Sequence, residues 1–72
     1  MLRAGYSSTG PLTPRMRDVL RSAAAGANAR ETAGELGIGT RTVEVLRANA
    51  CARLGARNVV HAVTLARDRG EL

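Results

Sequence analysis

The 72-residue sequence contains no tryptophan, no phenylalanine and no lysine, and it has a single tyrosine, histidine and cysteine. Cys51 has no second cysteine with which to form a disulfide, and no cysteine or histidine residues have the spacing of metal ligands. We therefore expect no disulfide, no metal site and no cofactor. A lone cysteine also fits a reducing, intracellular compartment.

Long apolar runs are absent too. Residues 1–10 contain no apolar run of the kind found in a signal peptide, and no segment approaches the roughly 20 apolar residues of a transmembrane helix. We expect a soluble cytoplasmic protein that is associated with the nucleoid and not with a membrane.

The residue patterns of common enzymes are missing as well. The sequence has no paired catalytic carboxylates on a shared element, no Ser/His/Asp set and no phosphate-binding glycine loop. A chain of this length does not easily enclose a pocket, so we expect neither an enzyme nor a small-molecule ligand. It also lies near the lower limit for a self-sufficient core, which makes dimerisation a reasonable source of extra stability.

What the sequence does have is positive charge. The formal net charge is +5, the sequence pI is about 11.4, and all 11 basic residues are arginines. The planar guanidinium suits phosphate and guanine because it donates two parallel hydrogen bonds. Nucleic acid is therefore the leading partner class. A compositional bias toward arginine and alanine is the alternative explanation.

Caps and apolar spacing predict two short helices after a flexible arm at residues 1–11. Thr13 is a good N-cap, Pro14 suits the first helical position, and Gly26 ends the first helix. Asn28 and Glu31 form an asparagine variant of the capping box for the second. The second helix carries a short inward stripe of Thr32, Ala33 and Leu36 and ends at Gly37.

A three-residue turn, with Ile38 as its buried centre, then leads to two more helices. The third is expected from about Thr40 to Leu54, and the fourth from about Asn58 to Arg69. Two short helices joined by a glycine-containing turn are typical of the helix-turn-helix motif. Nothing reads as a strand, so the sequence predicts an all-α fold with one domain at 12–72. The expected inward residues of the last two helices are Val43, Leu46, Ala50, Leu54, Val59, Ala62, Val63 and Ala66.

The order of these landmarks resembles the LuxR/GerE family of four-helix helix-turn-helix domains over residues 12–72, in the manner of its stand-alone, GerE-like regulators. The matching segments are Leu12-Thr13-Pro14-Arg15, Val19-Leu20, Ala25-Gly26, Arg30-Glu31 with Ala33, Leu36-Gly37-Ile38, Arg41-Thr42-Val43, Arg47-Ala48-Asn49, Leu54-Gly55, Arg57-Asn58 and Ala62-Val63. The resemblance implies a sequence-specific transcription regulator that binds double-stranded DNA as a homodimer and inserts its third helix into the major groove.

By position, the resemblance implies three sets of contact residues. Helical geometry independently places positions 41, 44, 45, 48 and 52 opposite the apolar stripe, on one outward face. The expected base contacts are Arg41, Glu44, Val45, Arg47 and Ala48. The expected phosphate contacts are Thr42, Arg30, Arg57 and Arg15. The expected dimer contacts on the fourth helix are Val60, His61 and Leu65.

Each assignment has an ordinary structural alternative. Arg41 and Arg47 would then be solvated charges, and Glu44 would pair with one of them along the helix. Val45 would be an exposed apolar residue without a role, and His61 a surface residue. Cys51 is expected to be a small buried residue.

Several positions depart from the family pattern. Glu44 stands where the family usually has a basic residue, and a carboxylate facing a polyanion lowers non-specific affinity. Thr32 and Ala50 replace larger aliphatic residues, and each missing buried methylene is worth about 0.8 kcal/mol. Leu46 stands where histidine is frequent. These departures keep a second hypothesis open, a protein-interaction module that partners a sigma factor, RNA polymerase or a related regulator. A DNA-binding accessory factor of a mobile element is a third.

Overall fold

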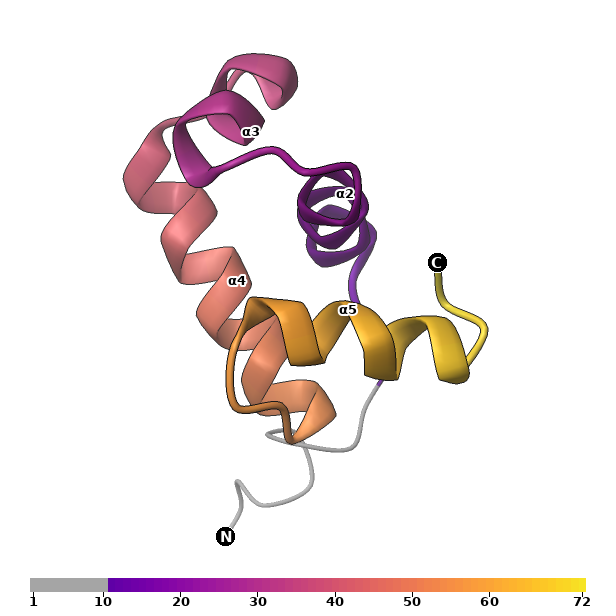
Figure 1. Cartoon of the computed structure of the whole chain (residues 1–72). Coiled ribbons are helices and arrows are strands. Elements are labelled where there is room, and N and C mark those ends of the chain that lie inside the picture. Colours follow the sequence, from indigo (N-terminus) through magenta and orange to yellow (C-terminus); the bar gives the residue numbers. More distant parts are fainter. Residues whose placement is uncertain (1–10) are drawn as a thin grey trace, which may run out of the picture.

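A computed structural model of the chain describes residues 11–72, which form four helices and no strand (Figure 1). The predicted arm at 1–11 lies outside the described residues except for Pro11. The expected four-helix, all-α architecture is confirmed, with helix bounds close to those predicted. The helices are α2 (Pro14–Ala24), α3 (Ala29–Leu36), α4 (Thr40–Leu54) and α5 (Val59–Asp68).

Three helices begin at the predicted side-chain caps. The Thr13 hydroxyl accepts a hydrogen bond of 3.2 Å from the backbone N–H of Met16, and Asn58 accepts one of 2.9 Å from His61. Asn28 and Glu31 form the complete capping box, with N···O distances of 2.8 and 2.9 Å. These side chains satisfy N–H groups that the first helical turn leaves unpaired.

Glycines end α3 and α4 as predicted. Gly37 and Gly55 have φ angles of 69° and 70°, in the left-handed region that side chains with a Cβ adopt at a cost. The chain changes direction at each of these residues (Figure 1). As a result α3 lies near one end of the long helix α4, and α5 lies near the other end (Figure 1).

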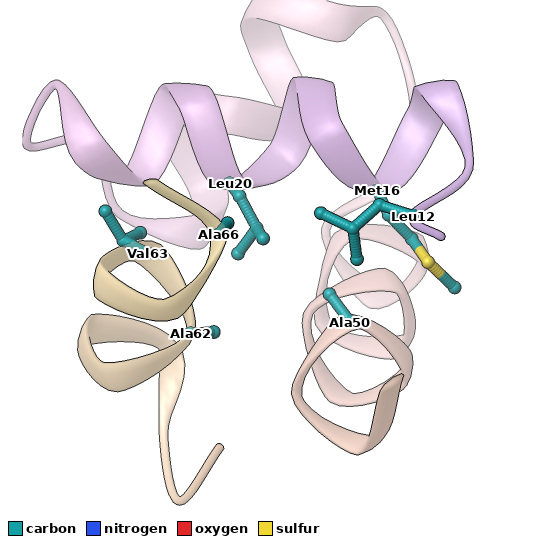
Figure 2. Packing of buried hydrophobic residues seen from close by; sticks show 7 residues of the cluster. All are labelled: Leu12, Met16, Leu20, Ala50, Ala62, Val63 and Ala66. Atoms are coloured by element: carbon teal, nitrogen blue, oxygen red, sulfur yellow. The ribbon is translucent and has the colours of Figure 1, made fainter. Parts of the chain in front are cut away.

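A larger apolar cluster joins α2 to α5 and to the second half of α4. Leu12 and Met16 face Ala50 of α4, whereas Leu20 faces Ala62 and Ala66 of α5 (Figure 2). Val63 completes the set of buried residues. Half-buried residues pack around this cluster, including the predicted inward residues Leu46, Leu54 and Val59.

A smaller cluster joins α2, α3 and the first half of α4. Its buried members are Val19, Ala33 and Val43, one from each helix. Ile38 and Leu36 pack against it but remain half-buried. Ile38 therefore covers the edge of this cluster instead of being the fully buried centre of the turn, because the turn lies at the surface.

Thr32 is fully buried as predicted, but its hydroxyl takes part in a polar contact that the apolar spacing did not predict. The Thr32 and Ser22 hydroxyl oxygens are 2.8 Å apart, and the Ser22 hydroxyl donates to Glu35 Oε1 at 2.7 Å. Since Ser22 has one proton and gives it to Glu35, Thr32 must donate to Ser22. This chain of hydrogen bonds links α2 to α3.

Candidate nucleic-acid interface

The motif at the centre of the site is α3, a three-residue turn and α4. α3 ends at Gly37, and α4 begins at Thr40 with Gly39 as its N-cap. Val43 packs in one cluster with Ala33, so α3 holds the first half of α4 in place. Gly39 has no side chain to cap α4, which leaves the first N–H groups of α4 without a side-chain acceptor.

α4 has a buried face and an exposed face, as its sequence predicted. Val43 and Ala50 are fully buried, whereas positions 41, 44, 45, 48 and 52 are all exposed. Val45 is notable because 46% of its surface is accessible, which is unusual for a large aliphatic residue in this domain. We call these five positions the exposed row of α4. A rigid helix that presents charged, apolar and small side chains along such a row fits the dimensions of the major groove of DNA.

The ion pairs of the domain lie away from α3 and α4. Among residues 11–72, Asp18 pairs with Arg15 and Arg21 at 3.6 and 3.5 Å, and Glu71 pairs with Arg17 and Arg69 at 3.4 and 3.3 Å. Each of these arginines lies on α2 or just after α5. The carboxylate of Asp18 or Glu71 offsets its charge. Arg15, a predicted phosphate contact, is exposed but shares Asp18.

Arg30 and Arg41 have a different environment. Both are exposed, and neither forms an ion pair within the described residues. Glu44 is also exposed without an ion pair there, so the alternative in which it pairs with Arg41 or Arg47 is not observed. Thr42 is exposed in the first turn of α4. Arg41 lies at the N-terminus of α4 that no side chain caps, and Arg30 lies in the first turn of α3, so both offer donors and positive charge to phosphate groups.

Arg47 is placed differently from the other expected base contacts. Its side chain is half-buried, and its Nη2 donates to the backbone carbonyl of Ala27 at 3.1 Å. Its Nε atom is buried and has no hydrogen-bond partner within residues 11–72. The structure therefore groups Arg41, Glu44, Val45 and Ala48 on the exposed row and does not bring Arg47 together with them.

Cys51 lies one helical turn after Arg47 and packs against the larger cluster, half-buried. Burial raises the pKa of the Cys51 thiol because it disfavours the thiolate, and the positive charge of Arg47 partly opposes this. The thiol is thus neutral near pH 7, although the residue was expected to be buried and is only half-buried.

The outer face of α5 holds the residues predicted to form a dimer contact. Val60 is 73% exposed, and His61 and Leu65 are half-buried. The Nδ1 atom of His61 accepts a hydrogen bond of 3.1 Å from the backbone N–H of Arg57, whose side chain is exposed. His61 therefore stabilises the start of α5.

Glu71 makes contacts that the sequence analysis did not predict. Its Oε1 accepts a hydrogen bond of 3.1 Å from the backbone N–H of Leu12, and its two oxygens pair with Arg17 and Arg69. The two partners Leu12 and Glu71 are 59 residues apart in the sequence, so no local pattern could have indicated the contact.

Within residues 11–72, no group of three or more histidine, cysteine, aspartate or glutamate residues is arranged to hold a metal ion. None of the helices described there is long and apolar enough to cross a membrane.

A short helix, a three-residue turn and a longer helix with one buried and one exposed face define this domain as a helix-turn-helix domain (Figure 1). Comparison with known families then gives its family. The chain belongs to the luxR family of bacterial regulatory proteins, whose sequence profile matches residues 10–66. The predicted family is thereby confirmed, and it is a family of regulators and not of enzymes.

Two curated relatives illustrate the relationship. The chain is 35% identical over 65 residues to the transcriptional regulatory protein DesR of Bacillus subtilis, a match that covers 90% of the chain and 33% of DesR. It is 46% identical over 50 residues to the transcriptional regulatory protein UhpA of Escherichia coli, which covers 69% of the chain and 26% of UhpA. The chain thus spans a third or less of the length of these relatives.

Proposed function

We propose that the chain is a DNA-binding transcription regulator that inserts α4 into the major groove of double-stranded DNA. The observation that carries this proposal is the exposed row of α4, which presents Val45 together with Arg41 and Glu44, neither of which forms an ion pair within residues 11–72. Val43 packs the opposite face of α4 into the smaller cluster. Membership of the luxR family supports the class, and DesR and UhpA are both named transcriptional regulatory proteins. The proposed location of the chain is the cytoplasmic nucleoid.

The exposed row of α4 supplies the proposed base contacts. Arg41 donates to a guanine or an adjacent phosphate, and Glu44 accepts from the amino group of a cytosine. Val45 contacts a thymine methyl group, and Ala48 permits close approach of the helix. Arg47 is the remaining predicted base contact, and its bond to Ala27 must break before it reaches a base.

The proposed phosphate contacts surround this row. Arg30 lies in the first turn of α3 and Thr42 in the first turn of α4, where helix N-termini favour anions. Arg57 precedes α5, and Arg15 lies in the first turn of α2. Of these residues, Arg15 contributes least because Asp18 already offsets its charge.

The proposed active form is a homodimer through α5. Val60 is the most exposed large apolar residue among those described, and His61 and Leu65 lie beside it on the same helix. A two-fold axis at α5 would place two α4 helices on half-sites about one helical turn apart. Analytical ultracentrifugation with and without a palindromic duplex tests this part of the proposal.

The decisive experiment is a salt titration of binding to a random duplex and to DNA from upstream of the gene. We expect affinity that falls steeply with salt on both, and tighter binding to the upstream DNA. Arg41→Ala should reduce affinity, and it should lower the salt slope by about one if Arg41 contacts a phosphate.

Arg21→Ala is the matched control for Arg41→Ala. It removes the same charge, but Arg21 lies at the end of α2 beside Asp18, so its loss should change affinity little. Equal effects of the two substitutions would show that net charge alone, and not the exposed row of α4, drives binding.

One observation favours a second candidate function. The carboxylate of Glu44, which forms no ion pair within residues 11–72, lies on the face that would meet a polyanion, and it suits a basic protein surface such as that of a sigma factor or RNA polymerase. Absence of DNA binding at low salt by the folded chain would favour this protein-interaction module. DNA bending without sequence preference would instead favour an accessory factor of a mobile element.

A further inference from the structure

The connection between α2 and α3 is a junction of three helices, and Arg47 is the side chain that closes it. The backbone N–H of Ala27 donates to the carbonyl of Ser22 on α2 at 3.2 Å, while the carbonyl of Ala27 accepts from Arg47 of α4 at 3.1 Å. The next residue, Asn28, caps α3 through its capping box. One loop residue is therefore hydrogen-bonded to both α2 and α4 just two residues before α3 begins at Ala29.

Arg47 lies on the face of α4 that packs toward α3, and it does not belong to the exposed row. It follows the buried Val43 by four residues, which places both side chains on the same side of the helix. Its buried Nε shows that packing as well as the hydrogen bond to Ala27 holds the guanidinium group. To touch DNA, the side chain would have to leave this site and break its bond.

We propose that Arg47 is a positioning residue that fixes the angle between α3 and α4, and that it contacts neither a base nor a phosphate. Ala33 and the half-buried Ala29 and Leu36 of α3 pack in one cluster with Val43, and apolar contacts of this kind constrain the angle of α3 only weakly. Arg47 adds a directional hydrogen bond to Ala27, beside the N-terminal end of α3. That end carries Arg30, so Arg47 sets where Arg30 lies relative to the exposed row of α4.

This role rests on the proposed function, because a fixed angle is useful only if both helices meet the same DNA. A protein that contacts several base pairs with one helix and phosphates with another needs a fixed relative orientation of the two helices. Loss of Arg47 should therefore weaken all specific contacts together. It should leave salt-dependent binding to random DNA nearly unchanged, since Arg47 itself contacts no phosphate and, where no bases are read, α3 can adopt any angle that brings Arg30 to a phosphate.

Two variants and one matched control test the inference. Arg47→Met keeps an unbranched side chain of similar packing but removes the charge and every donor. Arg47→Lys keeps the charge but loses the planar fork, and it serves if Arg47→Met does not fold. Arg53→Met is the control, because Arg53 lies on the same helix and also donates to a backbone carbonyl, that of Pro11 at 2.6 Å. It removes the same charge and the same kind of bond outside the α2–α3 junction.

The measurement is the affinity of each folded variant for a selected site, for its single-base variants and for a random duplex, across salt concentrations. We expect Arg47→Met to lower the ratio of specific to random affinity by about tenfold, the size of one lost base contact, spread over every position that α4 reads. Arg53→Met should leave the ratio unchanged. A substitution that merely destabilised the fold would not move this ratio in protein that remains folded.

Three results would overturn the inference while the proposed function stands. A salt slope lower by about one for Arg47→Met on both duplexes would show a phosphate contact. Lost discrimination at a single base position would show a base contact. An unchanged affinity ratio would show that the junction does not set the angle. Failure of the wild-type chain to bind any duplex would instead overturn the proposed function and this inference together.

Discussion

The two apolar clusters differ in size and in which helices their supplementary polar contacts join. The larger cluster contains seven buried residues, among them Leu20 and Met16, and it holds α5 and the second half of α4 against α2. The smaller cluster contains only Val19, Ala33 and Val43, and it holds the helix-turn-helix motif. Apolar burial scales with area, so the larger cluster contributes more to the free energy of folding.

Directional polar contacts supplement the smaller cluster. Ser22 links Thr32 and Glu35, and Arg47 links α4 to the loop before α3. Hydrogen bonds depend on angle and distance, whereas apolar contacts do so only weakly. We infer that the larger cluster provides most of the stability of the domain. The contacts around the smaller cluster define the orientation of the exposed face of α4.

The largest expected effect concerns the larger cluster. Leu20→Ala removes a fully buried side chain between α2 and α5 and should lower the free energy of unfolding by about 2–5 kcal/mol. In a domain of this size, each kcal/mol lowers Tm by about 4–8 °C, which thermal unfolding followed by circular dichroism will detect. Val45→Ala, which truncates an exposed aliphatic residue, is the control. Equal Tm values for the two variants would contradict the role given to the larger cluster.

The next effect concerns the polar contacts of the smaller cluster. Ser22→Ala leaves the buried Thr32 hydroxyl without its acceptor and should cost about 1–3 kcal/mol in urea unfolding. Thr32→Val replaces the hydroxyl by a methyl group and keeps the bond from Ser22 to Glu35, so it should cost less. If Thr32→Val proved as damaging as Ser22→Ala, the assigned direction of hydrogen bonding would be wrong.

The helices were predictable because their signals are local. Thr13, Asn28 and Asn58 cap their own helices within three residues, and Gly37 and Gly55 end α3 and α4 by their own conformations. Apolar spacing alone also predicted which positions of α4 are exposed. Such features depend on neighbours in the sequence, so a single sequence is sufficient to find them.

The contacts that orient the helices were not predictable in the same way. Along α4, Arg47 is one more polar residue beside the exposed row, and only the approach of the α2–α3 loop gives it the Ala27 carbonyl. The local pattern places Thr32 in an apolar stripe. It does not predict the contact with Ser22, because Ser22 lies on another helix. The resemblance to a family supplied the expected DNA contacts, which remain predictions for this chain.

A smaller effect is expected at Glu71, which supplements the larger cluster from outside. Glu71→Gln keeps an oxygen for the Leu12 N–H but loses the charge that faces Arg17 and Arg69. Because both arginines are about one third exposed, the loss should be about 1 kcal/mol in urea unfolding and should shrink at high salt. Asp68→Asn, an exposed acid without an ion pair in the described residues, is the control and should change little.

The smallest effect concerns the reactivity of Cys51, which packs against the larger cluster. Burial raises the pKa of its thiol, so less thiolate exists in the folded chain than in the unfolded chain at any given pH. Alkylation by iodoacetamide should therefore be slower in the folded protein, and its rise with pH should begin at higher pH. By the same linkage, the thiol's contribution to folded-state stability should be present below the ordinary pKa of a thiol and lost as pH rises through the raised value.

The same reagent can test whether the two clusters open independently. Cys51 packs against the larger cluster, so Leu20→Ala should speed its alkylation under conditions where the chain remains mostly folded. Ser22→Ala damages only the contacts around the smaller cluster and should leave the alkylation rate near that of the wild type. Equal acceleration in both variants would mean that the domain opens as a single unit, and the division between a stabilising half and an orienting half would then describe its contacts but not its dynamics.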